Sequence, residues 1–425
     1  MPGYLPRTNY FGISDVTGAP GLGFVFGSQR DIRQMALNSG WITTDTLQSQ
    51  LYINTLREDL SITSVIEPFR DFRITLTANK NRTMNYSTNF RYDNTSQAFR
   101  NLSPATTGDY SISYITLGTA FSEKQGSTLS KLFSKFMANR SVISQRLGAR
   151  NLNSRGVTGG YADGYNQNAQ DVVISAFMAA YTGKDASNIS LNSFPKIPLP
   201  NWRINYGGLG RMDFIAENFK SIDIRHAYRS VYAVNGFNSL LRYTESNGAV
   251  SSRDDNQNFL PFYQFSQVTI AETFSPLIGV DARLKNNLTA NFEIGRTRQL
   301  GLSLANSQLA QLSEGNMVFG IGYRTSKFRF PFGLFKDLKM DNNMDFKLDL
   351  AVRDIKTVIY RADVLEAEVS SGAKNITYRP TIDYILNQRF NVRLFYDANL
   401  TKPYTSQTFN TSFSNFGFSL RITLN

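Results

Sequence analysis

The C-terminal part of the chain, Lys374–Asn425, alternates apolar and polar side chains in three successive stretches. The apolar positions are Ile376, Tyr378, Pro380, Ile382, Tyr384 and Leu386, then Phe390, Val392, Leu394, Tyr396, Ala398 and Leu400, then Phe416, Phe418, Leu420, Ile422 and Leu424. Because successive side chains of a strand point to opposite faces, this period of two predicts β-strands with one apolar face. Each stretch is about 10 to 13 residues long, the length that a tilted strand needs to cross a bilayer. We interpret the region as the closing strands of an outer-membrane β-barrel.

The same alternation assigns side chains to the two sides of the predicted barrel wall, since such barrels are apolar outside and polar inside. The residues expected to face lipid are Tyr378, Ile382, Val392, Leu394, Phe418, Leu420 and Ile422. The residues expected to face the lumen are Arg379, Asp383, Arg393, Asp397 and Arg421. Ile385 and Phe395 are exceptions, because each is an apolar residue at a polar position.

The apolar rows of the first two stretches also predict a register, since directly opposed residues share a face. If Tyr384 faces Phe390, the connection is the three residues Leu386–Gln388, with Asn387 in the left-handed conformation that such turns favour. This register predicts two diagonal ion pairs, Asp383 with Arg393 and Arg379 with Asp397. Pro380 removes a ladder donor, which predicts a β-bulge at that position.

Composition agrees with a barrel and disfavours several other classes. The chain is 41% hydrophobic with a mean hydropathy of −0.29, which a barrel also gives because every second strand residue contacts water. No run approaches the length of a transmembrane helix. The net charge is +12, but the basic residues are spread along the predicted strands, so we expect no nucleic-acid partner. The absence of Cys excludes disulfides, thiolate catalysis and cysteine metal sites.

The chain divides into three predicted regions. They are a first portion of barrel strands (1–126), a helical insert (127–192) and the remaining barrel strands through the C-terminal strand (193–425). Apolar residues recur at helical spacing in Ser127–Leu147, with Ser127 as the expected cap, and a second helix is expected around Gln170–Tyr181 before Gly183. Asn151–Asn168 is rich in Gly and Asn, which is typical of a mobile linker. We expect the insert to be a plug, a cap or a periplasmic lid.

Other strands follow from the same pattern and bring the expected total to about 12 to 16. They are expected at Asp71–Lys80, Asn81–Tyr92, Tyr110–Phe121, Asn201–Leu209, Lys220–Val234, Phe262–Phe274, Val280–Arg296, Gln299–Leu309, Met317–Arg324 and Asn343–Arg353. Leu102–Asp109 is expected to be a turn, Ile355–Ala373 an outer connection and Phe328–Asp341 a long inner connection.

No residue pattern indicates catalysis, a cofactor or a metal. His226 is the sole histidine and shares its parity with apolar neighbours, so a structural contact is expected there. The acidic residues at Asp254–Asp255 and between Asp341 and Asp345 lack the spacing of an EF-hand. We therefore expect a non-enzymatic protein without cofactor or metal.

Several blocks resemble the SprA/Sov family, the outer-membrane translocon of the type IX secretion system. They are GAPGLGFVFGSQ (Gly18–Gln29), AFMAAYTGKD (Ala176–Asp185), LPNWRINYGGL (Leu199–Leu209), FKSIDIRHAYRSVYAVNGFNS (Phe219–Ser239) and NFGFSLRITLN (Asn415–Asn425). The resemblance covers most of the chain in scattered blocks that keep their order. Members of that family are far longer single polypeptides that form a very large barrel, so this sequence looks like a C-terminal portion.

The resemblance implies a protein-conducting channel in the outer membrane of a Gram-negative bacterium of the Bacteroidota type. It implies as partners the remainder of the translocon barrel, from an upstream segment or a separate chain, together with outer-membrane lipid and secreted cargo proteins. In that family a PorV-like barrel can cover a lateral opening, and a plug protein can seal the periplasmic end. The sequence that begins at Met1-Pro2-Gly3-Tyr4 lacks the basic region and apolar stretch of a signal peptide. A divided gene, a shortened piece of a longer protein and an internal methionine are three alternatives for Met1.

Two other functions remain open on the sequence. A self-contained barrel of about 14 strands would transport small solutes and would close on itself. A soluble all-β surface adhesin would bury its apolar strand faces against a second sheet and would need no detergent.

Overall fold

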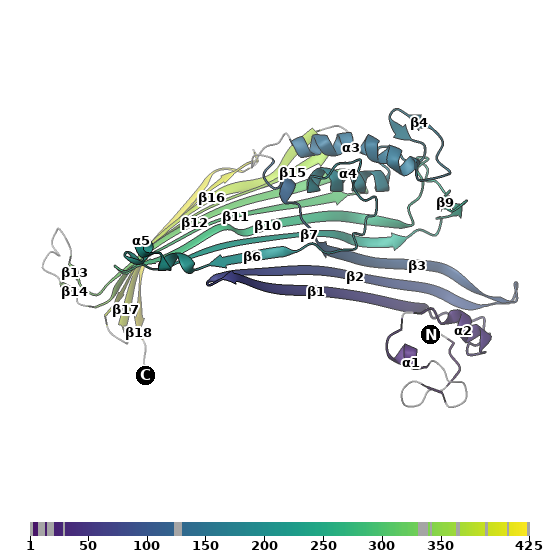
Figure 1. The fold of residues 1–425 in the computed structure, drawn as a ribbon, viewed down its shortest axis with the longest axis horizontal. Coiled ribbons are helices and arrows are strands. Elements are labelled where there is room, and N and C mark those ends of the chain that lie inside the picture. Colours follow the sequence, from purple (N-terminus) through teal and green to yellow (C-terminus); the bar gives the residue numbers. More distant parts are fainter. Residues whose placement is uncertain are drawn as a thin grey trace.

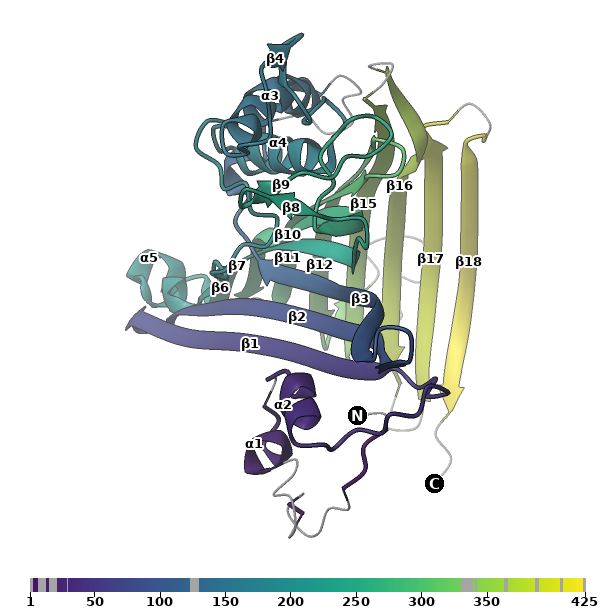
Figure 2. The same cartoon turned by 90° about the vertical axis from the view of Figure 1, so that its right-hand side faces the viewer.

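The computed structural model shows one large, twisted antiparallel sheet, and two helices, Lys131–Gly148 and Gln170–Thr182, pack together on one of its faces (Figure 1, Figure 2). It describes residues 3–6, 13–14, 21–28, 30–122, 130–329, 339–340, 342–362, 366–386, 390–405 and 408–422. The strands of the large sheet are β1 (Tyr52–Phe69), β2 (Phe72–Asp93), β3 (Ala98–Ser113), β6 (Asn201–Tyr206), β7 (Phe219–Ser239), β10 (Tyr263–Leu284), β11 (Leu288–Ser303), β12 (Gln308–Thr325), β15 (Met344–Arg361), β16 (Glu366–Ile385), β17 (Phe390–Pro403) and β18 (Thr411–Ile422).

The remaining elements are short strand pairs and helices. The strand pairs are β4 (Val157–Thr158) with β5 (Tyr161–Ala162), β8 (Glu245–Ser246) with β9 (Ala249–Val250), and β13 (Phe328–Arg329) with β14 (Lys339–Met340). The helices are α1 (Leu22–Val25), α2 (Arg33–Asn38), α3 (Lys131–Gly148), α4 (Gln170–Thr182) and α5 (Asp213–Ala216), with 3-10 turns at Leu117–Thr119 and Gly208–Arg211. None of the helices in the described ranges is both long and apolar enough to span a membrane.

The large sheet runs in the order β1-β2-β3-β7-β10-β11-β12-β15-β16-β17-β18, with β6 placed between β2 and β7. The antiparallel architecture with a helical insert is therefore confirmed. Among the described residues, β1 and β18 stand at the two edges of the sheet and do not pair with each other. Closure into a barrel stays a prediction.

The pleat gives the strands two contrasting faces, and the register keeps each face continuous from strand to strand. On β15 one face carries Met344, Phe346, Leu348, Leu350 and Val352, and the other carries Asp345, Lys347, Asp349, Ala351 and Arg353. We call the side of the sheet that carries Leu348 the apolar face, and the side that carries Lys347 the polar face.

The helical insert packs against the apolar face, at the end of the strands opposite the C-terminal end of β18 (Figure 1). Phe136 of α3 meets Phe177 of α4 edge to face, with ring centroids 6.5 Å apart. Phe133 of α3 stacks on Tyr360 of β15 at 4.9 Å. The strand residues of this core are fully buried, including Val268, Ile270, Leu300 and Leu302. Removing this apolar surface from water fixes the insert on the sheet.

Local signals explain where the two insert helices begin and end. The Ser130 side chain accepts a hydrogen bond from the Phe133 amide at 2.9 Å, so α3 begins after Ser130. Ser127, the expected cap, lies outside the described residues. The prediction for the second helix is confirmed, because α4 ends at Gly183 with a φ of 76°.

The segment between the two helices is folded, so the prediction of a linker at Asn151–Asn168 is wrong. It contains the hairpin β4–β5, and the side chain of Asn151 donates to Tyr165 Oη at 3.1 Å. Tyr165 in turn packs on Phe259, with ring centroids 5.3 Å apart. Tertiary contacts of this kind order a sequence whose composition favours turns.

The N-terminal residues also lie on the apolar face. The guanidinium of Arg33 on α2 lies 5.1 Å from the ring of Tyr52, 5.0 Å from that of Tyr86 and 5.6 Å from that of Phe90. These rings belong to β1 and β2, beyond the region that the helical insert covers. The rings and the cation attract each other through the negative faces of the aromatic systems.

Several expected strand boundaries are wrong, mainly because the strands are longer than expected. Asp71–Lys80 and Asn81–Tyr92 are not a hairpin but one continuous strand, β2, whose partner β1 was not foreseen. Leu102–Asp109 belongs to β3 and is not a turn, and Ile355–Ala373 belongs largely to β15 and β16 rather than to a connection. Of Phe328–Asp341, residues 330–338 and 341 lie outside the described residues.

The register of β16 and β17 differs by two residues from the expected one. Tyr384 pairs with Val392 and Asp383 pairs directly with Arg393. The shift of two keeps the assignment of every side chain to its face, which explains why the face pattern alone did not detect it. Asn387 lies outside the described residues. No register shift occurs at Pro380 in either ladder; the bulge of this strand lies near Val369–Ser371, opposite Thr357 and Val358.

Candidate functional site

The apolar face carries an exposed band on the half of the strands that the helical insert leaves open. On β15 it spans the nine positions from Met344 to Val352, whose apolar-face side chains are all hydrophobic. The band continues across the sheet at Phe72, Ile74, Leu76, Ala78, Trp202, Ile204, Tyr206, Ile222, Ile224, Ile278, Val280, Ala282, Leu288, Phe292, Ile294, Met317, Phe319, Ile321, Ile376, Tyr378, Ile382, Val392, Leu394, Leu400, Phe416, Phe418, Leu420 and Ile422. We call this set the apolar band. Within the described strands it contains no Asp, Glu, Lys or Arg.

The apolar band has the height of a membrane. Nine residues at about 3.3 Å each extend about 30 Å along a strand. A tilt of about 35–45° reduces this to about 21–25 Å, close to the height of about 25 Å of the apolar band on outer-membrane barrels. The side chains are accessible, with Phe416 73% and Phe418 70% exposed. Surface of this size and apolarity is stable when lipid or protein covers it.

The polar face opposite the apolar band carries a lattice of ion pairs. Arg393 contacts Asp383 at 2.6 Å, Arg379 contacts Asp397 at 3.2 Å, and Lys347 lies 3.9 Å from Asp383. Further pairs join Arg225 to Asp281 at 2.8 Å, Arg324 to Asp345 at 2.5 Å and Arg353 to Glu314 at 2.7 Å. In the pairs Arg225–Asp281 and Arg379–Asp397 both side chains are at least 41% exposed, so each of these pairs contributes about 0 to 1 kcal/mol. The carboxylates of Asp383 and Asp345 are only 7% and 12% exposed.

Phe395, the aromatic at a polar position, is explained by its neighbour on β18. Gly417 lies directly opposite, and a Cβ on Gly417 would come within 2.7 Å of the Phe395 ring. The ring therefore covers the glycine backbone, a contact that is known to support glycines in sheets. It does not interrupt the polar character of the face.

A buried polar girdle separates the open band from the helix-covered half of the apolar face. It is a row of directly paired residues on five neighbouring strands, Ser230, Glu272, Arg298, Ser313 and Lys356. Its centre is an ion pair in which Arg298 Nη2 lies 2.9 Å from Glu272 Oε2, with both side chains at most 5% exposed. Charges this deeply buried are stable only when they are paired and hydrogen-bonded.

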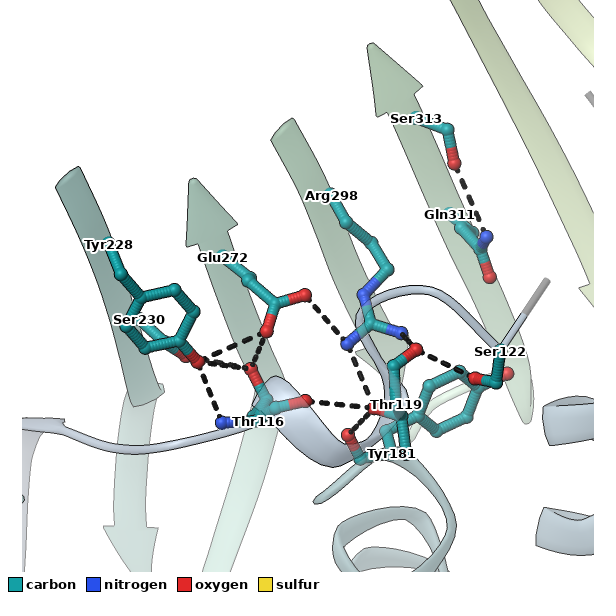
Figure 3. Close-up of polar contacts among 10 residues, drawn as sticks. All are labelled: Thr116, Thr119, Ser122, Tyr181, Tyr228, Ser230, Glu272, Arg298, Gln311 and Ser313. Carbon is teal, nitrogen blue, oxygen red and sulfur yellow. Dashed lines mark hydrogen bonds and ion pairs between the residues drawn. The ribbon is translucent and has the colours of Figure 1, made fainter. Parts of the chain in front are cut away.

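The residues that follow β3 complete this pair. Thr116 donates from its hydroxyl to Glu272 Oε1 at 2.5 Å, and Tyr228 donates to the same oxygen at 3.1 Å. Arg298 donates to the Thr119 carbonyl and hydroxyl, each at 3.0 Å. Thr119 also donates to the carbonyl of Tyr181 at the end of α4 (2.6 Å), so the network joins the sheet to the insert (Figure 3).

Two carboxyl groups of the insert titrate away from their ordinary values. Arg253 contacts Asp163 at 2.7 Å and, by hydrogen bonding, lowers the pKa of Asp163 to about 2. Burial raises the pKa of Asp171, in the first turn of α4, to about 6. The stability of the insert therefore depends on pH.

The structure places the residues chosen from the sequence on two opposite faces. Arg379, Asp383, Arg393, Asp397 and Arg421 lie on the polar face, and Tyr378, Ile382, Val392, Leu394, Phe418, Leu420 and Ile422 lie on the apolar face. Which medium each face contacts stays a prediction. Both expected ion pairs form, with Asp383 directly opposite Arg393 rather than diagonal to it.

The polar girdle was not predicted from the sequence, although the pattern of charged residues indicates it. Glu272 shares its parity with the buried Ile270 and Phe274, and Arg298 shares its parity with Leu300. A charged residue at an apolar position of two adjacent strands indicates a buried pair. The protonated Nδ1 of His226 donates a hydrogen bond to the Leu277 carbonyl, at 2.6 Å. In the part of the chain that the structure describes, no group of acidic or histidine side chains forms a metal site.

No family model and no curated protein matches this chain. Among solved structures, the chain is similar to in-vitro folded OmpT, an outer membrane protein of Vibrio cholerae, with 8% identity and a TM-score of 0.22 over 88% of this chain and 98% of that one. A trimer form of OmpT gives 9% identity and a TM-score of 0.21 over 88% and 99% of the two chains. TM-scores this low establish neither a shared fold nor a shared function.

Proposed function

We propose that this chain forms part of the wall of a protein-conducting channel in the outer membrane of a Gram-negative bacterium. Secreted proteins would pass along its polar face from the periplasm to the cell surface, as in type IX secretion. The observation that supports this most strongly is the pairing of a charge-free apolar band of membrane height with a polar face rich in ion pairs. The role is passive and needs no cofactor or catalytic group.

The unpaired edges of β1 and β18 favour a chain that forms part of a larger barrel wall over a self-contained barrel for small solutes. An unpaired strand edge leaves N–H and C=O groups without partners, and in hydrocarbon each such group costs several kcal/mol. β1 and β18 therefore need further strands beside them in a membrane. The remainder of the translocon barrel is the proposed source, with a PorV-like barrel and a periplasmic plug protein as the other partners that the family resemblance implies.

The position of the insert favours a cap among the three expected roles. A plug would contact the polar face that lines the channel, whereas α3 and α4 pack on the apolar face beyond the membrane band. If the C-terminal end of β18 is periplasmic, the insert lies outside the cell, beside the wall. The soluble adhesin is disfavoured, because a second sheet to cover Phe416 and Phe418 is not found among the described residues.

Single cysteines test the orientation of the wall, since the chain contains none. Phe418→Cys and Ser419→Cys are neighbours on opposite faces of β18. In vesicles prepared from the host outer membrane, where the rest of the wall is present, we expect a water-soluble maleimide to label Ser419→Cys quickly and Phe418→Cys only after detergent is added. Equal labelling of both positions in vesicles would contradict a membrane-spanning wall.

Secretion in the native host tests the protein-conducting role. Ser419→Cys and Thr381→Cys on the polar face are expected to form cross-links to secreted proteins when a bifunctional reagent is added, and deletion of the gene is expected to trap those proteins in the periplasm. Leu420→Cys on the apolar face is the matched control. Unchanged secretion with altered uptake of small solutes would support the solute channel instead.

A further inference from the structure

A row of basic residues lies on the apolar face directly above the apolar band. Arg296 on β11, Lys374 on β16 and Lys402 on β17 stand at one level of the sheet, joined by the pairings Arg296–Gly315–Asp354–Lys374–Lys402. The next level toward the C-terminal end of β18 is the first row of the band, Ile294–Met317–Val352–Ile376–Leu400. We call the upper level the basic row. It marks the border at which the face changes from charged to apolar.

Lys374 and Lys402 are direct cross-strand partners with the same charge. Like charges that face each other across a strand pair are destabilising. Both side chains are exposed, and no ion pair within 4.0 Å joins either of them to a carboxylate among the described residues, although Asp354 lies opposite Lys374 on the other side. The pair therefore favours an anion bound between or beside the two ammonium groups.

The acidic residue of the basic row is Asp354, which lies directly opposite Lys374, so one carboxylate stands beside two ammonium groups. Asp354 accepts a hydrogen bond from Tyr404 Oη at 2.8 Å. The ring of Tyr404 also lies 5.5 Å from the ammonium of Lys356, one level above. This contact crosses β16 at Gly372, where a Cβ would meet the Ile355 carbonyl at 2.4 Å. Tyr404, Asp354 and Lys356 thus form a fixed unit beside the two lysines.

Aromatic side chains accompany the cations along the border. The guanidinium of Arg296 lies 5.0 Å from the ring of Phe121, which is 51% exposed on the segment after β3. Tyr404 is 41% exposed at the other end of the row. Amphipathic rings and basic side chains at the edge of an apolar surface are typical of the level of lipid headgroups.

We propose that the basic row is a binding site for the phosphate of a phosphorylated membrane lipid whose acyl chains lie on the apolar band. The ligand needs an anionic head at the height of Lys374 and Lys402 and an apolar body that continues toward Ile376 and Leu400. A phosphorylated lipid whose headgroup lies at the level of the lysines supplies both the charge and the apolar body, whereas free phosphate supplies the charge alone. The proposal rests on the proposed membrane-spanning wall and adds a lipid class and a site to it.

The test uses the full chain, purified from the host outer membrane together with the rest of its wall and placed in lipid nanodiscs, with native mass spectrometry to count retained phosphorylated lipid. The variant is Lys374→Gln with Lys402→Gln. Its matched control is Arg379→Gln with Arg393→Gln, which removes the same charge from the polar face of β16 and β17. Each basic residue near an anionic surface contributes about 1 kcal/mol, so we expect about 10- to 30-fold weaker retention for the lysine double variant and no change for the control.

Three further outcomes of the experiments distinguish failure of the lipid site from failure of the membrane-spanning wall. Equal retention by both double variants and the parent chain in nanodiscs would overturn the site while leaving the membrane wall intact. Inorganic phosphate that displaces the lipid at equimolar concentration would show a plain anion site and overturn the lipid assignment. If Phe418→Cys and Ser419→Cys label equally in vesicles of the host outer membrane, the wall and the lipid site both fail. Unchanged thermal unfolding of the lysine variant in detergent controls for misfolding.

Discussion

The two halves of the apolar face have the same sequence pattern but different partners. Near the insert, Ile270, Leu302 and Tyr360 are at most 1% exposed because α3 and α4 cover them. In the band, Phe319, Leu394 and Phe418 are 37%, 40% and 70% exposed on the same side of the same sheet. The alternation of the sequence therefore specifies which face of the sheet a residue lies on. Whether that residue is buried depends on which other elements pack on that face.

The polar girdle at the boundary between the halves should show the largest effect. Glu272→Gln leaves the buried Arg298 without a charged partner, so we expect a loss of about 3–5 kcal/mol in the free energy of unfolding. Urea unfolding in detergent, followed by gel mobility, measures it. The double variant Glu272→Met with Arg298→Met removes both charges and should recover most of the loss. A single variant as stable as the parent would show that the girdle does not hold the insert.

The open half is tested by a charge at its centre. Leu348→Lys places an ammonium at the middle of the apolar band, and we expect it to destabilise the protein by about 2–4 kcal/mol in vesicles. A lysine on the polar face should have a much smaller effect. Ala351→Lys on the polar face of β15 is the matched control. Equal effects of the two variants would remove the distinction between the faces.

The covered half should respond to pH. The pKa of Asp171 is raised to about 6 in the folded insert, above the ordinary value near 4, so the folded state binds more protons in this interval. The stability of the insert is then expected to rise as pH falls from about 6 to 4. Asp163, with its pKa lowered to about 2, stabilises above pH 4, and its contribution is lost as pH falls to about 2.

Protease resistance of the insert between pH 3 and 8 measures this dependence. Asp171→Asn should flatten the rise between pH 6 and 4, while the loss below pH 4 remains. A profile for Asp171→Asn identical to that of the parent would exclude Asp171 as its source.

The smallest effect is expected from the ion pairs of the polar face. Arg379→Gln breaks an exposed pair with Asp397 and should change the free energy of unfolding by about 0 to 1 kcal/mol. Thermal unfolding in detergent at low and high salt measures it, with Glu272→Gln as the buried comparison. A change as large as that of Glu272→Gln would mean that this face is not in water.

Much of the sheet was predictable from the sequence because period-two alternation is a local property of each strand. The alternation assigned Arg393 and Leu394 to opposite faces. Separate helix signals, with Gly183 as the stop, located α4. The alternation did not give the strand lengths, because β2 continues through Asn81 without a change of pattern. It also missed the register of β16 and β17 by two residues, since a shift of two preserves both faces.

Strands with one apolar and one polar face, and a helical insert between them, follow from the amino-acid sequence alone. Side-chain direction and helix termination depend on residues near in the chain, so local patterns are sufficient for these conclusions. Three features follow only from the folded structure: the insert covers the apolar face, Glu272 and Arg298 form a buried pair with Thr116 and Thr119, and Lys374 faces Lys402. These contacts join residues far apart in the sequence, and their energies depend on burial that no local pattern records.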